Sequence, residues 1–416
     1  MKTARILALM TLTKLASGQG ICPTKHLAIF DADVAEFTEE RTLDLLPGVN
    51  NVEWRSLTPQ AFIGTLRLRA EQAEVVRQSI TLDGPEVRGQ KSAVLRLVLQ
   101  NSGARGPHKV QVDYLAPKLG WKADYSIMLG PAVNGSPQEL LVDGWVSVKN
   151  ESSTDVCAAM VDLIAGEVQL VDGARPGMRD YVVTSQAASN VYAGPADAAA
   201  GGGAQISHLS VFSRIALGRD ILLPANAYLE RFPLLQRVEF PLEERNVFEN
   251  DATAQTLGRG GFTLLPRGLE VRLVSRNTTA SPLPAGTVTI YSPEGEGAQV
   301  VGQDRIPLTP PGADLSITQG RSNNLQGTRR VVERVQVADT GGRYKLVTRV
   351  ELVIENRGGT PETAFVREGI ENFGKSDWSV TESSNPSQKL GERSMEFKLT
   401  IPAKDHVKLT YTVETR

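Results

Sequence analysis

The chain has 416 residues, 41% of them hydrophobic, which is enough to build the packed cores of about two to four domains. Its 45 Lys and Arg residues nearly balance its 47 Asp and Glu residues, giving a net charge of −2. Because no basic excess is available to neutralise phosphates, the composition argues against nucleic acid as a partner.

Residues 1–20 are predicted to be a signal peptide. Lys2 and Arg5 precede an apolar run over residues 6–12, and small residues at 16–18 offer a cleavage site, although Lys14 interrupts the pattern. The alternative is an ordinary N-terminal segment. No later run approaches the roughly 20 apolar residues of a membrane helix, so no transmembrane segment is expected. The predicted location is periplasmic or secreted.

Residues 21–90 are predicted to form an N-terminal β module, beginning with two strands over residues 26–45. An acidic turn joins these strands. Asp31 and Asp33 share a face there, and with Glu36 they are weak calcium candidates, because calcium prefers oxygen ligands. The alternative is a solvated turn or edge that discourages strand-to-strand aggregation. On balance the sequence predicts no metal site and no cofactor.

Residues 91–192 are predicted to form a β-sandwich module. Val110, Val112 and Tyr114 alternate with polar residues, and the same period of two recurs at residues 125, 127 and 129. This period is typical of half-buried strands. Trp121 and Trp145 are interpreted as aromatic side chains that pack strand ends against the core.

A strand that ends in Asn and is followed by a small polar turn recurs four times, at Asn101, Asn150, Asn277 and Asn356. Asn readily adopts left-handed backbone conformations and bonds its own turn. The pattern is common in immunoglobulin-like sandwiches. It occurs at irregular spacing, which excludes a solenoid of fixed period.

The rest of the chain is predicted to contain a flexible Ala/Gly loop over residues 193–205, a β module over 206–325 and a C-terminal β-sandwich module over 326–416. Residues 331–337 and 344–354 are expected to form a hairpin, and residues 395–401 to pair with 407–413. Arg329, Arg330 and Arg334 are interpreted as the exposed side of a strand. The alternative for this basic cluster is contact with an anionic polysaccharide or lipid headgroup.

The two cysteines, Cys22 and Cys157, allow two interpretations. In an oxidising compartment they could form a disulfide. Alternatively, one is a buried thiol and the other an exposed thiol near the N-terminus.

Recognisable catalytic motifs are absent from the sequence. The four histidines, His26, His108, His208 and His406, are far apart and share no ligand spacing. There is no phosphate-binding Gly-rich loop, no Gly-x-Ser-x-Gly elbow and no paired-Cys zinc pattern. These observations argue against an ordinary hydrolase or nucleotide enzyme, although a triad assembled from distant residues stays open.

A set of scattered aromatic, Gly, Pro and Asn residues comprises Tyr114, Trp121, Tyr125, Trp145, Asn150, Pro284, Gly286, Tyr291 and Asn356. This set resembles the structural motif of the mucoidy inhibitor A-like family, whose shared region is catalogued as a domain of unknown function. The resemblance covers most of the chain after about residue 25, and it implies no established activity. Asp155 follows the central Asn without the Trp that family members often have beside it.

The sequence therefore predicts an all-β protein with several immunoglobulin-like β-sandwich modules in series and little helix. The leading hypothesis is a non-enzymatic cell-envelope protein that binds or scaffolds an envelope protein or polysaccharide. One alternative is an envelope glycan or peptide hydrolase that uses carboxylates such as Asp31 and Asp33. Another is a purely structural spacer. The oligomeric state is left open by the sequence.

Overall fold

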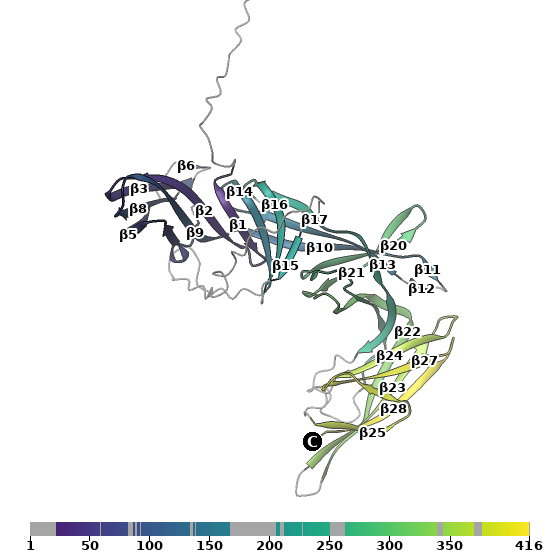
Figure 1. Cartoon of the computed structure of the whole chain (residues 1–416). Helices are drawn as coiled ribbons and strands as arrows, with labels where there is room; N and C mark the ends of the chain where they lie inside the picture. The colour runs from purple at the N-terminus through teal and green to yellow at the C-terminus, as the bar shows by residue number, and fades with distance from the viewer. Residues whose placement is uncertain are drawn as a thin grey trace, which may run out of the picture. The chain divides into compact units, whose positions relative to one another are not determined.

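The computed structural model describes residues 22–58, 60–81, 86–87, 90–91, 93–133, 136–137, 139–166, 205–208, 212–226, 228–249, 263–338, 344–369 and 377–415. Strands make up almost all of this structure, which confirms the predicted all-β fold (Figure 1). The helical segment in these ranges is one 3-10 turn, η1 (Ile63–Thr65). No helix in the described part is long and apolar enough to cross a membrane. The predicted signal peptide and residues 193–204 of the predicted loop lie outside the described ranges.

The chain divides into two compact units. Unit 1 comprises Met1–Lys122 and Ser147–Phe232, and unit 2 comprises Ala123–Val146 and Pro233–Arg416. The chain passes from one unit to the other three times, within strands β10, β13 and β17.

Unit 1 contains a seven-stranded and a three-stranded sheet, together with the small β6–β7 ladder. The seven-stranded sheet has the order β15 (Gln205–His208), β16 (Ser213–Leu223), β14 (Val156–Ala165), β1 (Thr24–Phe30), β2 (Val34–Leu45), β9 (Gly106–Pro117) and β4 (Arg67–Ala70). The three-stranded sheet has the order β3 (Gly48–Leu57), β8 (Ala93–Asn101) and β5 (Ala73–Thr81). The small ladder pairs β6 (Glu86–Val87) with β7 (Gln90–Lys91).

The remaining strands form a five-stranded and a nine-stranded sheet and a two-stranded ladder. The five-stranded order is β17 (Tyr228–Pro241), β13 (Glu139–Asn150), β10 (Leu119–Leu129), β20 (Gly286–Glu294) and β21 (Gly297–Ile306); the ladder pairs β11 (Ala132–Val133) with β12 (Ser136–Pro137). The nine-stranded order is β25 (Trp378–Ser383), β28 (His406–Thr415), β23 (Tyr344–Asn356), β22 (Asp314–Ala338), β19 (Arg267–Arg276), β18 (Glu243–Glu249), β24 (Glu362–Gly369), β27 (Ser394–Ile401) and β26 (Ser387–Lys389).

These units differ from the serial modules that the sequence predicts. β8, which belongs to the second predicted module, lies between β3 and β5 of the first. β1 pairs in parallel with β14, more than a hundred residues later in the chain. β22 runs through the boundary predicted between residues 325 and 326. The pairings are non-local, and local patterning carries no information about which distant strands will meet.

The core of unit 1 contains a buried carboxylate. Phe37 of β2 and Tyr114 of β9 stack with ring centroids 5.0 Å apart. Beside them, Glu39 accepts a hydrogen bond from the Tyr114 hydroxyl (3.0 Å) and another from Nε1 of Trp54 (2.7 Å). Trp54 comes from β3 of the three-stranded sheet, so the carboxylate ties the two sheets of unit 1 together. Burial and the Glu39 charge raise the pKa of Tyr114 well above its usual range, which keeps the hydroxyl a donor.

The nine-stranded sheet of unit 2 encloses an apolar core that also holds an ion pair. Arg329 on β22 and Glu368 on β24 both have fully buried side chains, and Nε of Arg329 lies 2.7 Å from Oε1 of Glu368. The prediction that Arg329 lies on the exposed side of a strand is therefore wrong. Strand alternation shows which residues share a face, but an Arg on the inner face is recognisable only once its acidic partner is known.

The last two long strands do not pair as predicted. The hairpin prediction is confirmed, because β22 and β23 form an antiparallel ladder that includes Val331 opposite Val350. In contrast, β27 pairs with β24 and β26, whereas β28 pairs with β23 and β25. The short connection at residues 402–405 therefore joins β27, near one edge of the sheet order, to β28, near the other edge. Period-two patterning identifies a strand but not its partner.

The four Asn residues singled out in the sequence form one recurrent corner. Asn101, Asn150, Asn277 and Asn356 are all buried. In each corner the side-chain oxygen accepts the backbone N–H two residues later, at 2.8–3.0 Å. The amide nitrogen donates to a carbonyl three or four residues later, and in the last three corners also to a distant one. These distant acceptors are the carbonyl oxygens of Leu223, Thr309 and Ile401.

Substitution of one corner tests its contribution. Asn356→Ala leaves the carbonyls of Thr360 and Ile401 and the N–H of Gly358 without their partners. We expect the free energy of unfolding of unit 2 to fall by about 2 kcal/mol, the cost of unsatisfied buried polar groups. Urea unfolding, with the exposed Asn51→Ala as control, measures the effect. A change no larger than that of the control would contradict a structural role for this corner.

Candidate functional site

The seven-stranded sheet has an apolar and a polar face because side chains alternate along each strand. Leu27 and Ile29 of β1 are fully buried on the apolar face, whereas His26 and Ala28 lie on the other face. The pairing registers extend this second face over β16, β14, β2, β9 and β4. We call nine of its polar side chains the polar row: His26, Glu36, Thr38, Arg67, Arg69, Gln111, Asp113, Asp162 and Arg214.

Asp162 is the centre of one half of the polar row. Its side chain is completely buried, and its Oδ2 lies 2.5 Å from Nε2 of His26 and 2.7 Å from Nη2 of Arg214. These partners come from β1 and β16, the strands on either side of β14. Asp162 Oδ1 is also buried and has no hydrogen-bond partner. The carboxylate is therefore oriented from two sides, and one of its oxygens stays free to accept.

Asp113 is the centre of the other half. Its Oδ1 accepts hydrogen bonds from Thr38 (3.0 Å) and Gln111 (2.7 Å). Its Oδ2 accepts hydrogen bonds from Arg67 (3.3 Å) and Arg69 (3.2 Å) on the edge strand β4. About half of each arginine side chain is exposed, so their remaining N–H groups are open to solvent.

Glu36 lies between these two halves. It is only partly exposed, and no hydrogen bond to its carboxylate forms within the described ranges. Burial raises the pKa of Glu36 above its usual value, and the charge of Asp113 raises it further, while His26, Arg67 and Arg69 oppose the shift. A carboxyl group with a perturbed pKa among fixed charges makes this part of the sheet a candidate functional site.

The pH dependence of stability tests this environment. Because the folded chain binds the Glu36 proton more tightly than the unfolded chain, the contribution of Glu36 to stability is present below its ordinary pKa of 4.5 and is lost as pH rises through its raised pKa in the folded chain. Glu36→Gln removes this loss, so the variant should gain stability relative to the wild type between about pH 4 and pH 7. Denaturant unfolding across that range measures it, with the exposed Glu74→Gln as control. Parallel pH profiles for Glu36→Gln and the wild type would contradict the pKa shift.

The structure separates the three calcium candidates. Asp31 and Asp33 are exposed in the turn between β1 and β2, whereas Glu36 belongs to the polar row. Asp33 has a positive φ of 57°, and its backbone carbonyl accepts the N–H of Lys118. Within the described ranges, no group of three or more His, Cys, Asp or Glu side chains is arranged to hold a metal ion.

The residues of the family-like motif lie elsewhere and have packing roles. The indole of Trp121 donates to the Ile164 carbonyl (3.3 Å), and the hydroxyl of Tyr125 donates to the Pro284 carbonyl (2.8 Å). Gly286 faces Ala123 across the β10–β20 ladder, where a Cβ would lie 2.4 Å from the Ala123 oxygen. Only glycine, which has no Cβ, allows the two strands to lie this close together. The other residues of the motif are the half-buried Trp145 and Tyr291, the core residue Tyr114, and the corner residues Asn150 and Asn356.

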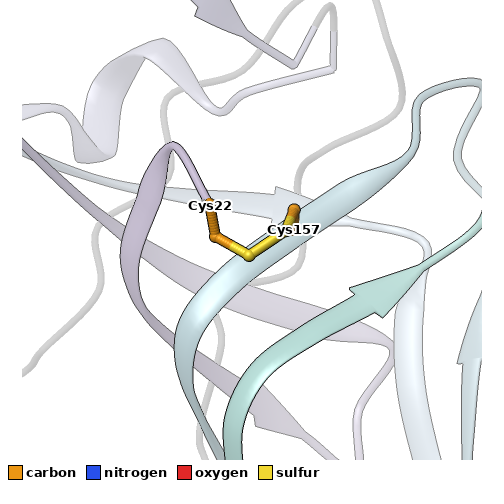
Figure 2. The surroundings of a disulfide bond; sticks show 2 residues. All are labelled: Cys22 and Cys157. Atoms are coloured by element: carbon orange, nitrogen blue, oxygen red, sulfur yellow. A yellow bond between two sulfur atoms is a disulfide. The ribbon is translucent and has the colours of Figure 1, made fainter. Parts of the chain in front are cut away.

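Cys22 and Cys157 form a disulfide, the first of the two interpretations that the sequence left open (Figure 2). Cys22 lies two residues before β1, and Cys157 is the second residue of β14. The bond therefore joins the beginnings of the parallel strands that carry His26 and Asp162. It holds these two neighbouring strands together at the ends where both begin.

An open hollow of about 450 Å³ lies at the Asn356 corner of unit 2. Its charged lining is largely paired internally: Arg357 lies 3.1 Å from Glu355, and His406 lies 3.3 Å from Asp405. These groups are exposed, and such pairs contribute little to stability. The polar row, which combines burial with unsatisfied acceptors, is the stronger candidate site.

Sequence reasoning missed most of the polar row. His26 was set aside because no second histidine has ligand spacing to it, and Asp162 was not singled out. One signal could have found Asp162: it interrupts the apolar run of β14, where a charge is costly unless it is paired. Its partners, His26 and Arg214, are too far away in the sequence to be inferred from spacing.

Comparison with known proteins adds no evidence about the role of these residues. No protein-family model matches this chain, and no curated protein matches it. The resemblance to the mucoidy inhibitor A-like family therefore stays a prediction, based on residues that pack strands and turns. The case for function depends on the polar row.

Proposed function

We propose that the protein is an exported, non-enzymatic cell-envelope protein that binds another envelope component through the polar row. The observation that carries this proposal is the set of fixed charges on a rigid sheet, with the Glu36 carboxylate and Asp162 Oδ1 lacking donors. Acceptors that the fold orients but leaves unsatisfied favour a ligand that supplies donors. The half-exposed Arg67 and Arg69 provide a point of entry at the edge of the sheet.

The disulfide supports the export part of this proposal. Disulfides persist in oxidising compartments and are rare in the cytosol. The Cys22–Cys157 bond directly follows the segment predicted to be a signal peptide. A periplasmic or secreted location accounts for both features.

A hydrolase is the second candidate, and one observation favours it. Glu36 is a carboxyl group whose pKa is raised by burial, and Asp162 is a carboxylate fixed by two basic side chains on the same face. Pairs of carboxyl groups in contrasting environments perform acid and base roles in glycoside hydrolysis. This pair replaces Asp31 and Asp33 as the carboxylates of that hypothesis.

A crosslinking experiment tests the binding function. The native chain, tagged at its C-terminus, is crosslinked in cells and purified, and mass spectrometry identifies its mature N-terminus and its companions. Processing near residue 20 with envelope components attached supports the proposal. An intact Met1 with cytosolic companions overturns export. Release of reducing sugar or peptide by the purified protein, abolished in Glu36→Gln, would favour the hydrolase instead.

A further inference from the structure

One side of β22 is open over residues 331–338. β19 pairs with the first part of β22 as far as Gly327, and Thr263 bridges β22 at Arg330. Beyond this bridge β22 pairs with β23, and no other strand of the described ranges pairs with its opposite side. An unpaired side of a strand presents a row of backbone N–H and C=O groups. We call residues 331–338 the free edge.

The free edge is apolar for a solvent-exposed strand. Val332, Val335 and Val337 are 41%, 40% and 40% exposed. Proteins usually protect an open edge by keeping it short or by placing charged residues or proline along it. At one end of the same sheet order, β26 has only three residues, all of them polar and exposed. The free edge is longer and richer in valine, so its backbone and its side chains favour the addition of another strand.

Its valines and charges make the free edge complementary to itself. Glu333 and Arg334 are its two charged residues, so the free edge has no net charge. Val335 lies opposite Val347 in the ladder with β23 and shares a face with it. When two such edges meet antiparallel across a two-fold axis, each side chain lies opposite one from the same face. A two-fold axis at Val335 therefore forms a continuous row from Val335 and Val347 of both copies.

The charges favour this register over its neighbours. With the axis at Val335, Arg334 lies opposite Gln336 of the second copy. Glu333 lies opposite Val337 in the same arrangement. With the axis at Arg334, the two arginines would lie opposite each other, and like charges in that position are destabilising. With the axis at Gln336, Glu333 would have to pair beyond the end of β22.

We propose that the free edge is a homodimer interface, through which two copies of the chain pair antiparallel across a two-fold axis at Val335. The pairing joins the nine-stranded sheets of both copies into one continuous sheet. This inference concerns unit 2 and is independent of binding at the polar row. Because an edge-to-edge contact is small, the association should be reversible and should depend on protein concentration.

Site-specific disulfide crosslinking tests the register in the full-length protein. Val335→Cys places the two introduced thiols directly opposite each other, so mild oxidation should yield a covalent dimer on a non-reducing gel. The native Cys22 and Cys157 are already joined to each other and leave the introduced thiol as the free one. Val337→Cys is the matched control and should stay monomeric on the gel, because its two thiols would be about 14 Å apart along the strands.

The oligomeric state of charged variants tests the interface itself. In analytical ultracentrifugation, the wild type should show a monomer–dimer equilibrium. Val335→Lys places like charges opposite each other, so the dimer should be lost. Val300→Lys, a change at a 52% exposed valine on β21, should leave the equilibrium unchanged. Both variants should keep the urea midpoint of the wild type, because both side chains are exposed.

The results have a definite reading in each direction. A covalent dimer in Val335→Cys but not in Val337→Cys, together with loss of the dimer in Val335→Lys, supports the inference. A wild type that sediments as a monomer at every concentration overturns it, as does a dimer that Val335→Lys leaves intact. Equal crosslinking of the two cysteine variants overturns the axis at Val335.

Discussion

Removal of the Cys22–Cys157 disulfide is expected to lower the free energy of unfolding of unit 1 by about 3–5 kcal/mol. The bond closes a loop of 135 residues, and a longer loop gives a larger loss of unfolded-state entropy on crosslinking. It also anchors the start of β1, a central strand of the seven-stranded sheet. Denaturant unfolding of Cys22→Ser with Cys157→Ser measures the effect, and hydrogen exchange assigns it to unit 1.

Reduction provides the control for this prediction. A reducing agent should destabilise the wild type to the level of the double variant and should leave the double variant unchanged. Slow hydrogen exchange in the nine-stranded sheet of unit 2 should be retained in both cases. Equal stability of the oxidised wild type and the double variant would contradict the role assigned to the bond.

Breaking the Arg329–Glu368 pair from one side is expected to destabilise unit 2 by about 3–5 kcal/mol, because it leaves a buried charge without its partner. Arg329→Met is the variant of choice, since Met fills a similar volume and carries no charge. Replacing both residues, by Arg329→Met with Glu368→Leu, should recover most of the loss, because apolar side chains replace both charges. Urea unfolding of the two single variants and the double variant completes the cycle.

An exposed pair gives the matched comparison. Arg276 and Asp314 lie 3.0 Å apart with most of each side chain in solvent. Arg276→Met should change the free energy of unfolding by less than about 1 kcal/mol. A similar effect at both arginines would show that burial does not determine the strength of the buried pair.

Local patterns were sufficient to predict strands and turns. The period of two placed residues 110–114 and 125–129 on strands, and these residues belong to β9 and β10. The Asn corners were recognisable because an Asn amide bonds within its own turn, which is a local interaction. The β22–β23 hairpin was recognisable for the same reason, since its strands are neighbours in the chain.

Long-range pairing explains what could not be predicted. The parallel contact of β1 with β14 brings His26 to Asp162 over 136 residues, and no spacing rule reaches so far. The same holds for Arg329 and Glu368, which face each other across the core of the nine-stranded sheet. Of the three calcium candidates, only Glu36 belongs to the polar row. A charge pattern that places carboxylates on one face does not show which neighbouring strand will complete the face.

The Asn corners also affect how this protein can be produced. Asn150-Glu151-Ser152 and Asn277-Thr278-Thr279 both match the acceptor sequence for N-linked glycosylation. In the folded chain these two side-chain amides are buried and donate to carbonyl oxygens in unit 1 and unit 2. A glycan attached there during secretion from a eukaryotic host would remove donors from both corners and block their closure. Such a host should therefore yield misfolded glycoprotein, and because the Ser152 and Thr279 hydroxyls also donate hydrogen bonds within these corners, a host that attaches no N-linked glycans suits this protein better than removal of the acceptor sequences.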